Sequence, residues 1–519
     1  MEKPVLNHFY NYEEICAYLK SALTHHCDVM TLDSLAKTDE GRDIWGITLC
    51  RDGNPDEKPA LYVQGGVHAK EGMGITCCLN FLWTVLEQKS DILDQLTVYI
   101  LPCTNPDGSD LCVKTGLALR SKLELIPGLS NAVIPQDLDG DGKILFMRWE
   151  DPAGYYVDLP ECGNMLVPRR PGDRGPFYNM ITEGIVANYD GGSLQLGYRA
   201  LDFNRQYGFS WKNNANAGDF PGNHIEPRTI MKFLSTHPNI FMIMDVHCGT
   251  RALMYGTPNN VADARFLEKL AYMCQDIADI EPVTTGNYAR RDGDPATQLD
   301  GHIDDYAYHA LGIPSLTVEL GNGFNSLGMN AHQVFNAQHY ERELVTQLAA
   351  MHKAKGRIIA YPWKKVNHPQ LGEVEVGGRD YHNAYIMDPD DMLELLPKVA
   401  EYFLKVSEMV PVLDFTNITC EAMGADIYRI RVGIINNGQL NTRILYGATG
   451  YQAIRDNIQF KIEGAQEVLS SKGAEAVHSL DPLDMANAEW FICAKPGDQI
   501  TVKAVFPKAV NAEKTVILS

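Results

Sequence analysis

The residues whose types and spacing best suit chemistry lie in LYVQGGVHAKE, residues 61–71. An apolar run typical of a strand breaks at two glycines, and His68 and Glu71 follow, three residues apart. An imidazole and a carboxylate held on one turn can bind the same borderline-soft cation, such as zinc. Because His-x-x-Glu spacing also arises by chance on exposed polar turns, the pair alone is weak evidence for a metal site.

Two further apolar runs end on polar residues that could complete such a site. FMIMDVH, residues 241–247, ends on His247, and SLTVEL, residues 315–320, carries Glu319 next to its end. In open α/β sheets, reactive groups collect where strands finish. The pattern therefore predicts that polar residues from three strand ends meet in one active-site crevice.

The elements expected to position these residues alternate between strand-like and helix-like periods up to about residue 405. The candidate strands are residues 43–49, 61–65, 96–102, 241–246 and 315–320. The candidate amphipathic helices are residues 12–23, 74–88, 263–278 and 390–409. This alternation predicts an α/β fold with a mixed, largely parallel sheet and helices on both faces.

The pattern changes near residue 411, where short alternating strands begin. YRIRVGIINNGQL, residues 428–440, ends in a turn signal, and WFICA, QITVKAVF and KTVILS follow as further strand candidates. We expect a small β-sandwich without a catalytic constellation, acting as a docking or stabilising module. The predicted organisation is a catalytic domain at 1–408, with an insertion at about 110–200, and an accessory domain at 411–519.

Composition bounds the class of protein and its partners. A chain of 519 residues exceeds one ordinary core, and 45% apolar with 21% charged residues is typical of a globular protein. The formal charge of -21 disfavours nucleic acid and anionic membranes as partners. With no secretory signal and no apolar run of the roughly 18 residues that a membrane span needs, we expect a cytoplasmic protein.

The twelve cysteines show no paired spacing, so we expect no disulfides and no four-sulfur zinc site. Cys77 and Cys78 are adjacent and close in sequence to the proposed metal pair, where they could be oxidised. The other cysteines are expected to be small buried apolar residues.

Five motifs, in order along the chain, make it resemble the zinc metallocarboxypeptidases, the family typified by carboxypeptidases A and B. They are GGVHAKE, LPCTNPDG, LDFNRQYGFSW, DVHCGT and DDYAYHALGIPSLTVELG. The resemblance covers residues 1 to about 360 and implies the zinc carboxypeptidase fold. It also implies one Zn²⁺ per chain, held by His68, Glu71 and His247, with an open coordination position for water.

The resemblance assigns further roles around the metal. Asp202 would orient the first histidine from outside the coordination sphere. Glu319 would act as the general base that takes a proton from water and passes it to the leaving amine. Asn204 and Arg205 would bind the free carboxylate of a C-terminal residue through parallel hydrogen bonds, which favours an exopeptidase.

The resemblance also implies an arginine that stabilises the oxyanion, located between the NPDG and DFNR motifs. We assign Arg148 to this role, in preference to Arg169 and Arg170. Tyr288 is the candidate for the mobile tyrosine that covers bound substrate.

Asp304 is expected at the base of the specificity pocket, where a carboxylate would select a basic terminal residue. A shift of the alignment by one residue would place Ile303 there and reverse the preference.

The insertion carries a second metal signal in DLDGDGKI, residues 137–144. Asp137, Asp139 and Asp141 resemble the first half of a calcium loop, although Arg148 stands where the twelfth-position glutamate belongs. A structural Ca²⁺ and a solvated acidic turn both stay open. Calcium would rigidify the insertion rather than take part in chemistry.

The function expected from these residues is a zinc-dependent carboxypeptidase that removes a C-terminal amino acid from peptides, with Glu319 as general base. One alternative is an amidohydrolase or deacylase that acts on amino-acid conjugates or cell-wall peptides. The other is a non-catalytic peptide-binding protein that retains the fold, for which a general base would have no use. With no propeptide-like segment visible, we expect the enzyme to be made in active form, and the sequence leaves its oligomeric state unknown.

Overall fold

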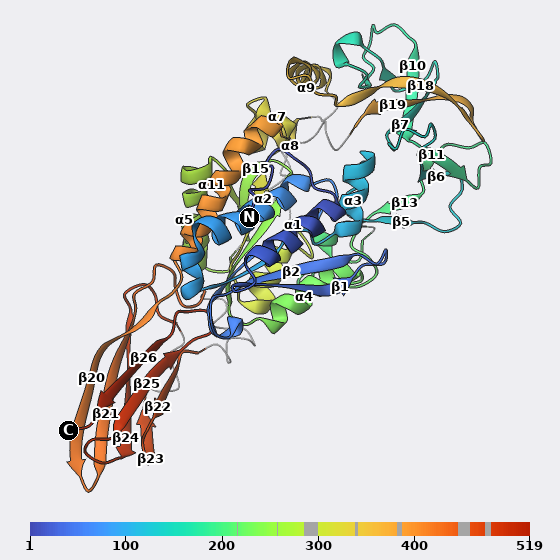
Figure 1. Ribbon diagram of the computed structural model, residues 1–519. Helices are drawn as coiled ribbons and strands as arrows, with labels where there is room; N and C mark the ends of the chain where they lie inside the picture. Colours follow the sequence, from blue (N-terminus) through green and yellow to red (C-terminus); the bar gives the residue numbers. More distant parts are fainter. Residues whose placement is uncertain are drawn as a thin grey trace.

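The computed structural model describes residues 1–214, 216–256, 258–284, 299–337, 341–380, 387–444, 457–472 and 479–519. Figure 1 shows a central α/β body with a β lobe at one end and a second β-rich unit at the other. No helix among these residues is both long enough and apolar enough for a membrane crossing. All twelve cysteines are free thiols.

The body is built on an eight-stranded mixed sheet with the order β1-β2-β4-β3-β14-β17-β15-β16. Its strands are β1 (Met30–Lys37), β2 (Asp43–Leu49), β3 (Ala60–Gly65), β4 (Thr97–Leu101), β14 (Ile240–His247), β15 (Arg251–Tyr255), β16 (Glu281–Thr284) and β17 (Ser315–Leu320). The central run β4-β3-β14-β17 is parallel, and β2 and β15 pair with it antiparallel. All five strands expected from the sequence lie in this sheet.

Helices cover both faces of the sheet because the central strands are apolar on both sides. Leu61 and Val63 of β3 join one core cluster, whereas Tyr62 between them joins another, since successive strand residues point to opposite faces. The first cluster packs against α1 (Tyr12–His25), α2 (Gly72–Gln88), α5 (Val261–Ala278) and α11 (Pro389–Glu408). The second packs against α4 (Ile225–Thr236), whose Phe233 ring lies 5.7 Å from that of Tyr62. The predicted fold class is confirmed.

The structure contains further helices. They are α3 (Pro106–Thr115), α6 (Ile303–Asp305), α7 (Gly323–Ser326), α8 (Ala331–Asn336), α9 (Arg342–Ala354) and the single turn η4 (Phe203–Arg205).

The β lobe is assembled from two distant parts of the chain (Figure 1). Its six-stranded sheet has the order β18-β19-β7-β10-β8-β9. The strands are β7 (Phe146–Glu150), β8 (Tyr156–Val157), β9 (Val167–Pro168), β10 (Phe177–Thr182), β18 (Ala360–His368) and β19 (Gly372–Arg379). Smaller sheets join β11 (Gly184–Ala187), β6 (Ala132–Pro135) and β12 (Gln195–Leu196), and β13 (Tyr198–Ala200) with β5 (Leu123–Leu125). The sequence predicted the insertion but not that β18 and β19 would join it.

The C-terminal unit consists of two antiparallel sheets with a core of their own. One sheet contains β20 (Leu413–Gly424), β21 (Ile427–Asn436), β24 (Met485–Cys493) and β23 (Glu467–Lys472). The other contains β22 (Gln459–Glu463), β25 (Gln499–Val505) and β26 (Ala512–Ile517). Trp490 lies in the core between them, whereas Leu440 packs into the core of the body. The domain boundary near residues 408–411 therefore stays a prediction.

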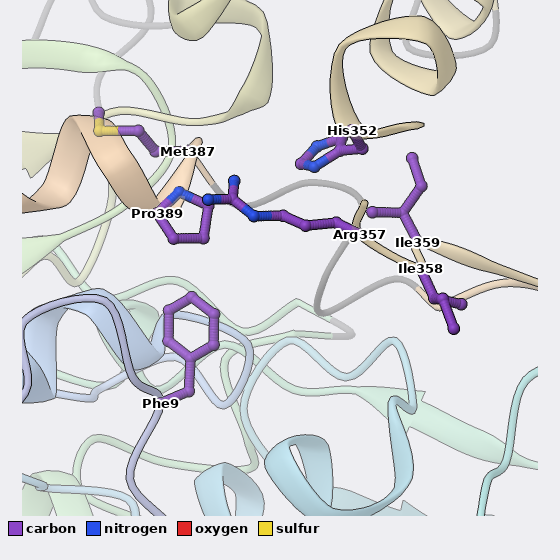
Figure 2. A pocket seen from close by; sticks show the side chains of 7 residues that line it. All are labelled: Phe9, His352, Arg357, Ile358, Ile359, Met387 and Pro389. Atoms are coloured by element: carbon purple, nitrogen blue, oxygen red, sulfur yellow. The ribbon is translucent and has the colours of Figure 1, made fainter. Parts of the chain in front are cut away.

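A small cavity of about 180 Å³ lies where the N-terminal segment, α9, α11 and the start of β18 meet (Figure 2). Its wall is formed by Phe9, His352, Arg357, Ile358, Ile359, Met387 and Pro389. His352 is 1% exposed, and neither of its ring nitrogens has a hydrogen-bond partner among the described residues. Burial, reinforced by the charges of Arg357 and Lys355, lowers the pKa of His352 to about 4. This joint therefore holds a neutral imidazole at neutral pH.

Candidate active site

Parallel strand ends bring three metal-binding side chains together. The loop that leaves β3 carries His68, and Glu71 stands at the start of α2. His247 is the last residue of β14, the parallel neighbour of β3. The ligand atoms of these three buried residues all lie within 4.8 Å of one another. Only glycine fits at Gly65, because a Cβ there would lie 2.7 Å from the Gly74 carbonyl oxygen in the first turn of α2.

Two carboxylates fix how the histidines face the site. Nε2 of His68 lies 3.0 Å from Oδ1 of Asp202, and Nε2 of His247 lies 2.8 Å from Oδ2 of Asp245. Because a carboxylate accepts, each ring carries its proton on Nε2 and directs the lone pair of Nδ1 inward. The two Nδ1 atoms are 3.0 Å apart, and each lies 2.9 Å from an oxygen of Glu71. Such lone pairs repel without a cation, and imidazole and carboxylate ligands suit Zn²⁺.

The charges around the centre also favour a bound cation. Burial raises the pKa of Glu71, but the charges of His68 and His247 outweigh it and hold this pKa well below its usual range. Burial lowers the pKa of His247, whereas Asp245 and Glu71 raise it well above its usual range. The arrangement therefore stabilises positive charge at its centre.

Asp202 stands next to the first histidine, where the sequence placed it. It caps η4 and accepts a hydrogen bond from the backbone N–H of Asn204 at 2.9 Å. Burial raises the pKa of Asp202, but Arg120 and His68 lower it well below its usual range. Asp245, which orients His247, was missed. The sequence could have identified Asp245 from its spacing, because residues 245 and 247 lie on the same side of a strand.

Glu319 reaches the same centre from the next strand. In the parallel pair β14 and β17, the Cα partner of Glu319 is His247, so both side chains stand on the same face. Glu319 is 5% exposed, and its carboxylate accepts a hydrogen bond from the backbone N–H of Gly249. The carboxylate is thus held beside the metal-binding residues and not among them.

Asn204 and Arg205 follow Asp202 in η4 and lie beside the metal centre. Asn204 Nδ2 is 3.5 Å from His247 Nε2, and its Oδ1 accepts a hydrogen bond from the backbone N–H of Ile303 at 3.0 Å. The half-buried guanidinium of Arg205 donates to the carbonyl oxygen of Asn204 at 2.6 Å. It forms no ion pair with a described carboxylate. A guanidinium is therefore left to bind an anion.

A family model described as zinc carboxypeptidase matches residues 15–123 and 187–343, which together make up just over half of the chain. The chain belongs to the zinc carboxypeptidase family. The stretch between the two matched blocks contains most of the β lobe, so the lobe is an addition to the zinc carboxypeptidase body. A second model, a domain of unknown function (DUF8731), matches residues 412–517.

Individual relatives in this family match shorter stretches. Carboxypeptidase B of Astacus astacus is 29% identical over 103 residues, 19% of this chain and 33% of that protein. Zinc carboxypeptidase A 1 of Drosophila melanogaster is 32% identical over 107 residues, 19% of this chain and 25% of that protein. The crystal structure of carboxypeptidase A from Helicoverpa armigera aligns at 20% identity and a TM-score of 0.41, covering 67% of this chain and 75% of that chain. The matched part spans a quarter to a third of the two sequence relatives.

A zinc carboxypeptidase needs a cation near the developing oxyanion, and the structure does not favour Arg148 for this role. Arg148 lies on β7 in the lobe, where its guanidinium pairs with Asp158 at 2.7 Å and Glu375 at 2.8 Å. It also stacks over the rings of Tyr178 and Trp363. These contacts join strands of the lobe. The alternatives Arg169 and Arg170 contact Phe177 and Glu343.

Arg120, which the sequence analysis missed, is the arginine that contacts the zinc carboxypeptidase centre. Its Nη1 lies 3.2 Å from Glu71 Oε1, and its Nε donates to Asp202 Oδ2 at 3.1 Å. Its carbonyl oxygen accepts a hydrogen bond from the backbone N–H of Ala69 at 2.8 Å, which ties the connection between α3 and β5 to the metal-binding loop. The signal was its position shortly after the NPDG motif, which ends at Gly108.

Asp304 does not suit the recognition of a basic substrate residue. It is 1% exposed, and its two carboxylate oxygens accept hydrogen bonds from the hydroxyls of Ser315 and Thr317. Burial raises its pKa to about 7. The alternative, Ile303, is the residue whose backbone contacts Asn204. Tyr288 lies outside the described residues.

Residues of the lobe already bind the carboxylates of Asp137 and Asp139 in the acidic loop. Asp137 accepts hydrogen bonds from the backbone N–H groups of Gly140 and Gly142 at 2.7 and 2.8 Å. Asp139 pairs with Lys364 at 2.9 Å. Asp137, Asp139 and Glu183 form a group of carboxylates that could hold a metal ion. Glu183, which the sequence did not suggest, stands in this group where Asp141 was expected. These contacts do not require calcium, which stays a prediction.

Proposed function

We propose that this chain is a metallocarboxypeptidase that hydrolyses the C-terminal residue from peptides. The observation that carries the proposal is the register of β14 and β17, which sets Glu319 beside His247 at the metal centre. Arg205 next to the same centre adds a binding group for a terminal carboxylate. The family match supports a hydrolase, and the positions of Glu319 and Arg205 support a carboxypeptidase.

Each side chain has a defined task in this reaction. When bound, Zn²⁺ would supply a water of lowered pKa and a Lewis acid for the scissile carbonyl. Glu319 takes the proton of the attacking water and passes it to the leaving amine. Arg120 stabilises the negative charge that develops on the carbonyl oxygen, because its guanidinium already faces the metal centre. Asn204 and Arg205 hold the terminal carboxylate and so fix which peptide bond is cleaved.

The two alternatives differ in how they would use this centre. An amidohydrolase or deacylase on amino-acid conjugates or cell-wall peptides would share the metal and the base but accept a different acyl group. A peptide-binding protein would need Arg205 but would have no use for a general base at the metal. The presence of Glu319 beside His247 favours an enzyme.

The proposal is tested with a panel of blocked dipeptides and the variant Glu319→Gln. We expect kcat to fall by roughly 10²–10⁴-fold while zinc content is unchanged, because the base is lost and the ligands remain. Glu401→Gln, at an exposed position on α11, is the matched control and should leave both values unchanged. Undiminished hydrolysis by Glu319→Gln would defeat the mechanism.

A second comparison separates an exopeptidase from an endopeptidase. Conversion of the terminal carboxylate of the best substrate to an amide removes the charge that Arg205 binds. We expect hydrolysis of the amide to be lost. Equal hydrolysis of acid and amide would favour the amidohydrolase, and stoichiometric zinc without hydrolysis of any member would favour the binding protein.

A further inference from the structure

Residues 301–303, at the start of α6, contact the backbone and side chains around Asn204 and Arg205, the proposed carboxylate-binding pair. The carbonyl oxygen of Gly301 accepts a hydrogen bond from the backbone N–H of Tyr207 at 3.0 Å, and Ile303 donates to Asn204 at 3.0 Å. A Cβ at Gly301 would lie 2.4 Å from the carbonyl oxygen of Arg205, so the two backbones are in direct contact. His302 stands between these two attachments and therefore lies beside Asn204 and Arg205.

The ring of His302 has one nitrogen engaged and one available. His302 is 2% exposed, and its Nδ1 accepts a hydrogen bond from the backbone N–H of Asp304 at 3.3 Å. A neutral ring that accepts at Nδ1 carries its proton on Nε2. No described residue forms a hydrogen bond with Nε2. The ring thus offers a single directed N–H donor.

The surroundings of His302 keep its ring uncharged. Burial, followed by the charges of Arg205 and His247, lowers the pKa of His302 well below its usual range. A neutral imidazole in that place donates a hydrogen bond without competing with Arg205 for the terminal carboxylate.

We propose that His302 is a specificity-determining residue whose Nε2–H donates a hydrogen bond to an acceptor oxygen on the side chain of the substrate's terminal residue. The inference rests on the proposed carboxypeptidase function and names its substrate class: peptides that end in Gln, Asn, Glu or Asp. An apolar terminal residue would leave the buried N–H without a partner. A basic terminal residue offers no acceptor, and the hydroxyls of Ser315 and Thr317 already occupy Asp304.

The test variant is His302→Asn, because Asn keeps an acceptor for the Asp304 N–H and is a favoured helix cap, but lacks a donor at the Nε2 position. His302→Gln is the rescue variant, because its amide nitrogen reaches further and can replace Nε2–H. Each protein is assayed with blocked dipeptides that share one acyl residue and end in Gln, Glu, Leu or Lys. Zinc content is measured for each variant to show that the centre is intact.

We expect the wild-type chain to cleave the Gln and Glu substrates best. His302→Asn should lower kcat/KM for these by roughly 10-fold, mainly through KM, and leave the Leu substrate nearly unchanged. His302→Gln should restore part of the loss. An equal loss over all four substrates, or a wild-type preference for Leu or Lys, would overturn the inference while leaving the carboxypeptidase function intact.

A binding measurement tests the role of His302 separately from the carboxypeptidase activity. Calorimetry with Glu319→Gln compares the affinities of N-acylated glutamine and N-acylated leucine, which need no turnover. Tighter binding of the glutamine compound that disappears in the double variant with His302→Asn supports the inference even if hydrolysis is absent. Equal affinity of the two compounds contradicts it.

Discussion

The two metal histidines are each held by a carboxylate on the side away from the metal. Asp202 accepts from His68, and Asp245 accepts from His247 while its other oxygen accepts from Gln64 at 2.8 Å. Since such partners fix the tautomer and the orientation of a ligand, their loss weakens metal binding without removing a ligand.

We predict that Asp245→Asn lowers zinc affinity by roughly 10–100-fold, because a neutral amide oxygen makes the ring a poorer donor to the metal. The affinity is measured by competition with a chelator of known strength. Asp276→Asn, at an exposed position on α5, controls for the loss of one charge. An unchanged affinity in Asp245→Asn would show that the carboxylate has no such effect.

Arg120 gives a second prediction at the scale of a residue. Arg120→Lys keeps the charge but loses the planar fork that contacts Glu71 and Asp202 at once. We expect kcat to fall by roughly 10²–10³-fold with a smaller change in KM. Arg148→Lys is the comparison, because it changes the lobe and leaves the centre in place. A larger loss of activity in Arg148→Lys than in Arg120→Lys would indicate that Arg148 stabilises the oxyanion.

The sequence predicted the residues whose positions follow from local order. His68, Glu71, His247 and Glu319 stand at or just after the ends of apolar strands, and parallel strands bring such ends together. For the oxyanion arginine, the contacts of the structure favour Arg120 over the predicted Arg148, and the insertion hid the distance between the motifs from sequence reasoning. The structure disfavours Asp304 as a selector of basic residues, because its carboxylate accepts hydrogen bonds from Ser315 and Thr317 of β17, a contact between α6 and β17 that no local sequence pattern encodes.

At the scale of elements, strands buried on both faces were the most predictable. Their continuous apolar runs admit few alternatives, and β3, β14 and β17 were found at nearly their observed limits. The pairing of β19 with β7 was missed, because half-exposed strands from distant segments carry no signal of their partner.

The burial of His352 in the cavity between α9 and α11 predicts how the free energy of unfolding changes with pH. The pKa of His352 falls from 6.5 to about 4 in the folded chain. As the pH drops from about 6.5 towards 4, the unfolded chain binds a proton that the folded chain refuses, so the free energy of unfolding decreases. His352→Leu should remove this part of the acid sensitivity and, by deleting unsatisfied nitrogens, stabilise the protein at neutral pH by about 1–3 kcal/mol.

The measurement is urea unfolding, followed by tryptophan fluorescence at several pH values. His25→Leu, at an exposed position near the end of α1, is the matched control and should leave the pH profile unchanged. A steeper loss of stability in acid for His352→Leu than for the wild type would contradict the interpretation.

At the scale of the whole molecule, the body and the C-terminal unit have separate cores. Leu440 packs into the body, and Lys508 donates to the carbonyl oxygen of Gly312 at 3.4 Å. A separate core favours independent unfolding of the two units.

We predict two transitions in calorimetry, of which only one responds to removal of zinc, because a ligand stabilises the unit that binds it. Trp490→Ala, which opens a cavity in the C-terminal core, should lower the other transition by an amount that corresponds to about 3–5 kcal/mol. Zinc content and peptide hydrolysis should be unchanged. A single transition that shifts in both experiments would show that the units unfold as one.

The composite lobe also sets an order of events during synthesis. Arg148 and Glu375, which join β7 to β19, are 227 residues apart. At about 5–20 residues per second, a ribosome needs roughly 10–45 s to make the intervening polypeptide. By the end of that interval His68, Glu71 and His247 have all been synthesised, whereas β7 has had no β19 to pair with. The nascent chain therefore completes its catalytic half before it can close the domain inserted into it.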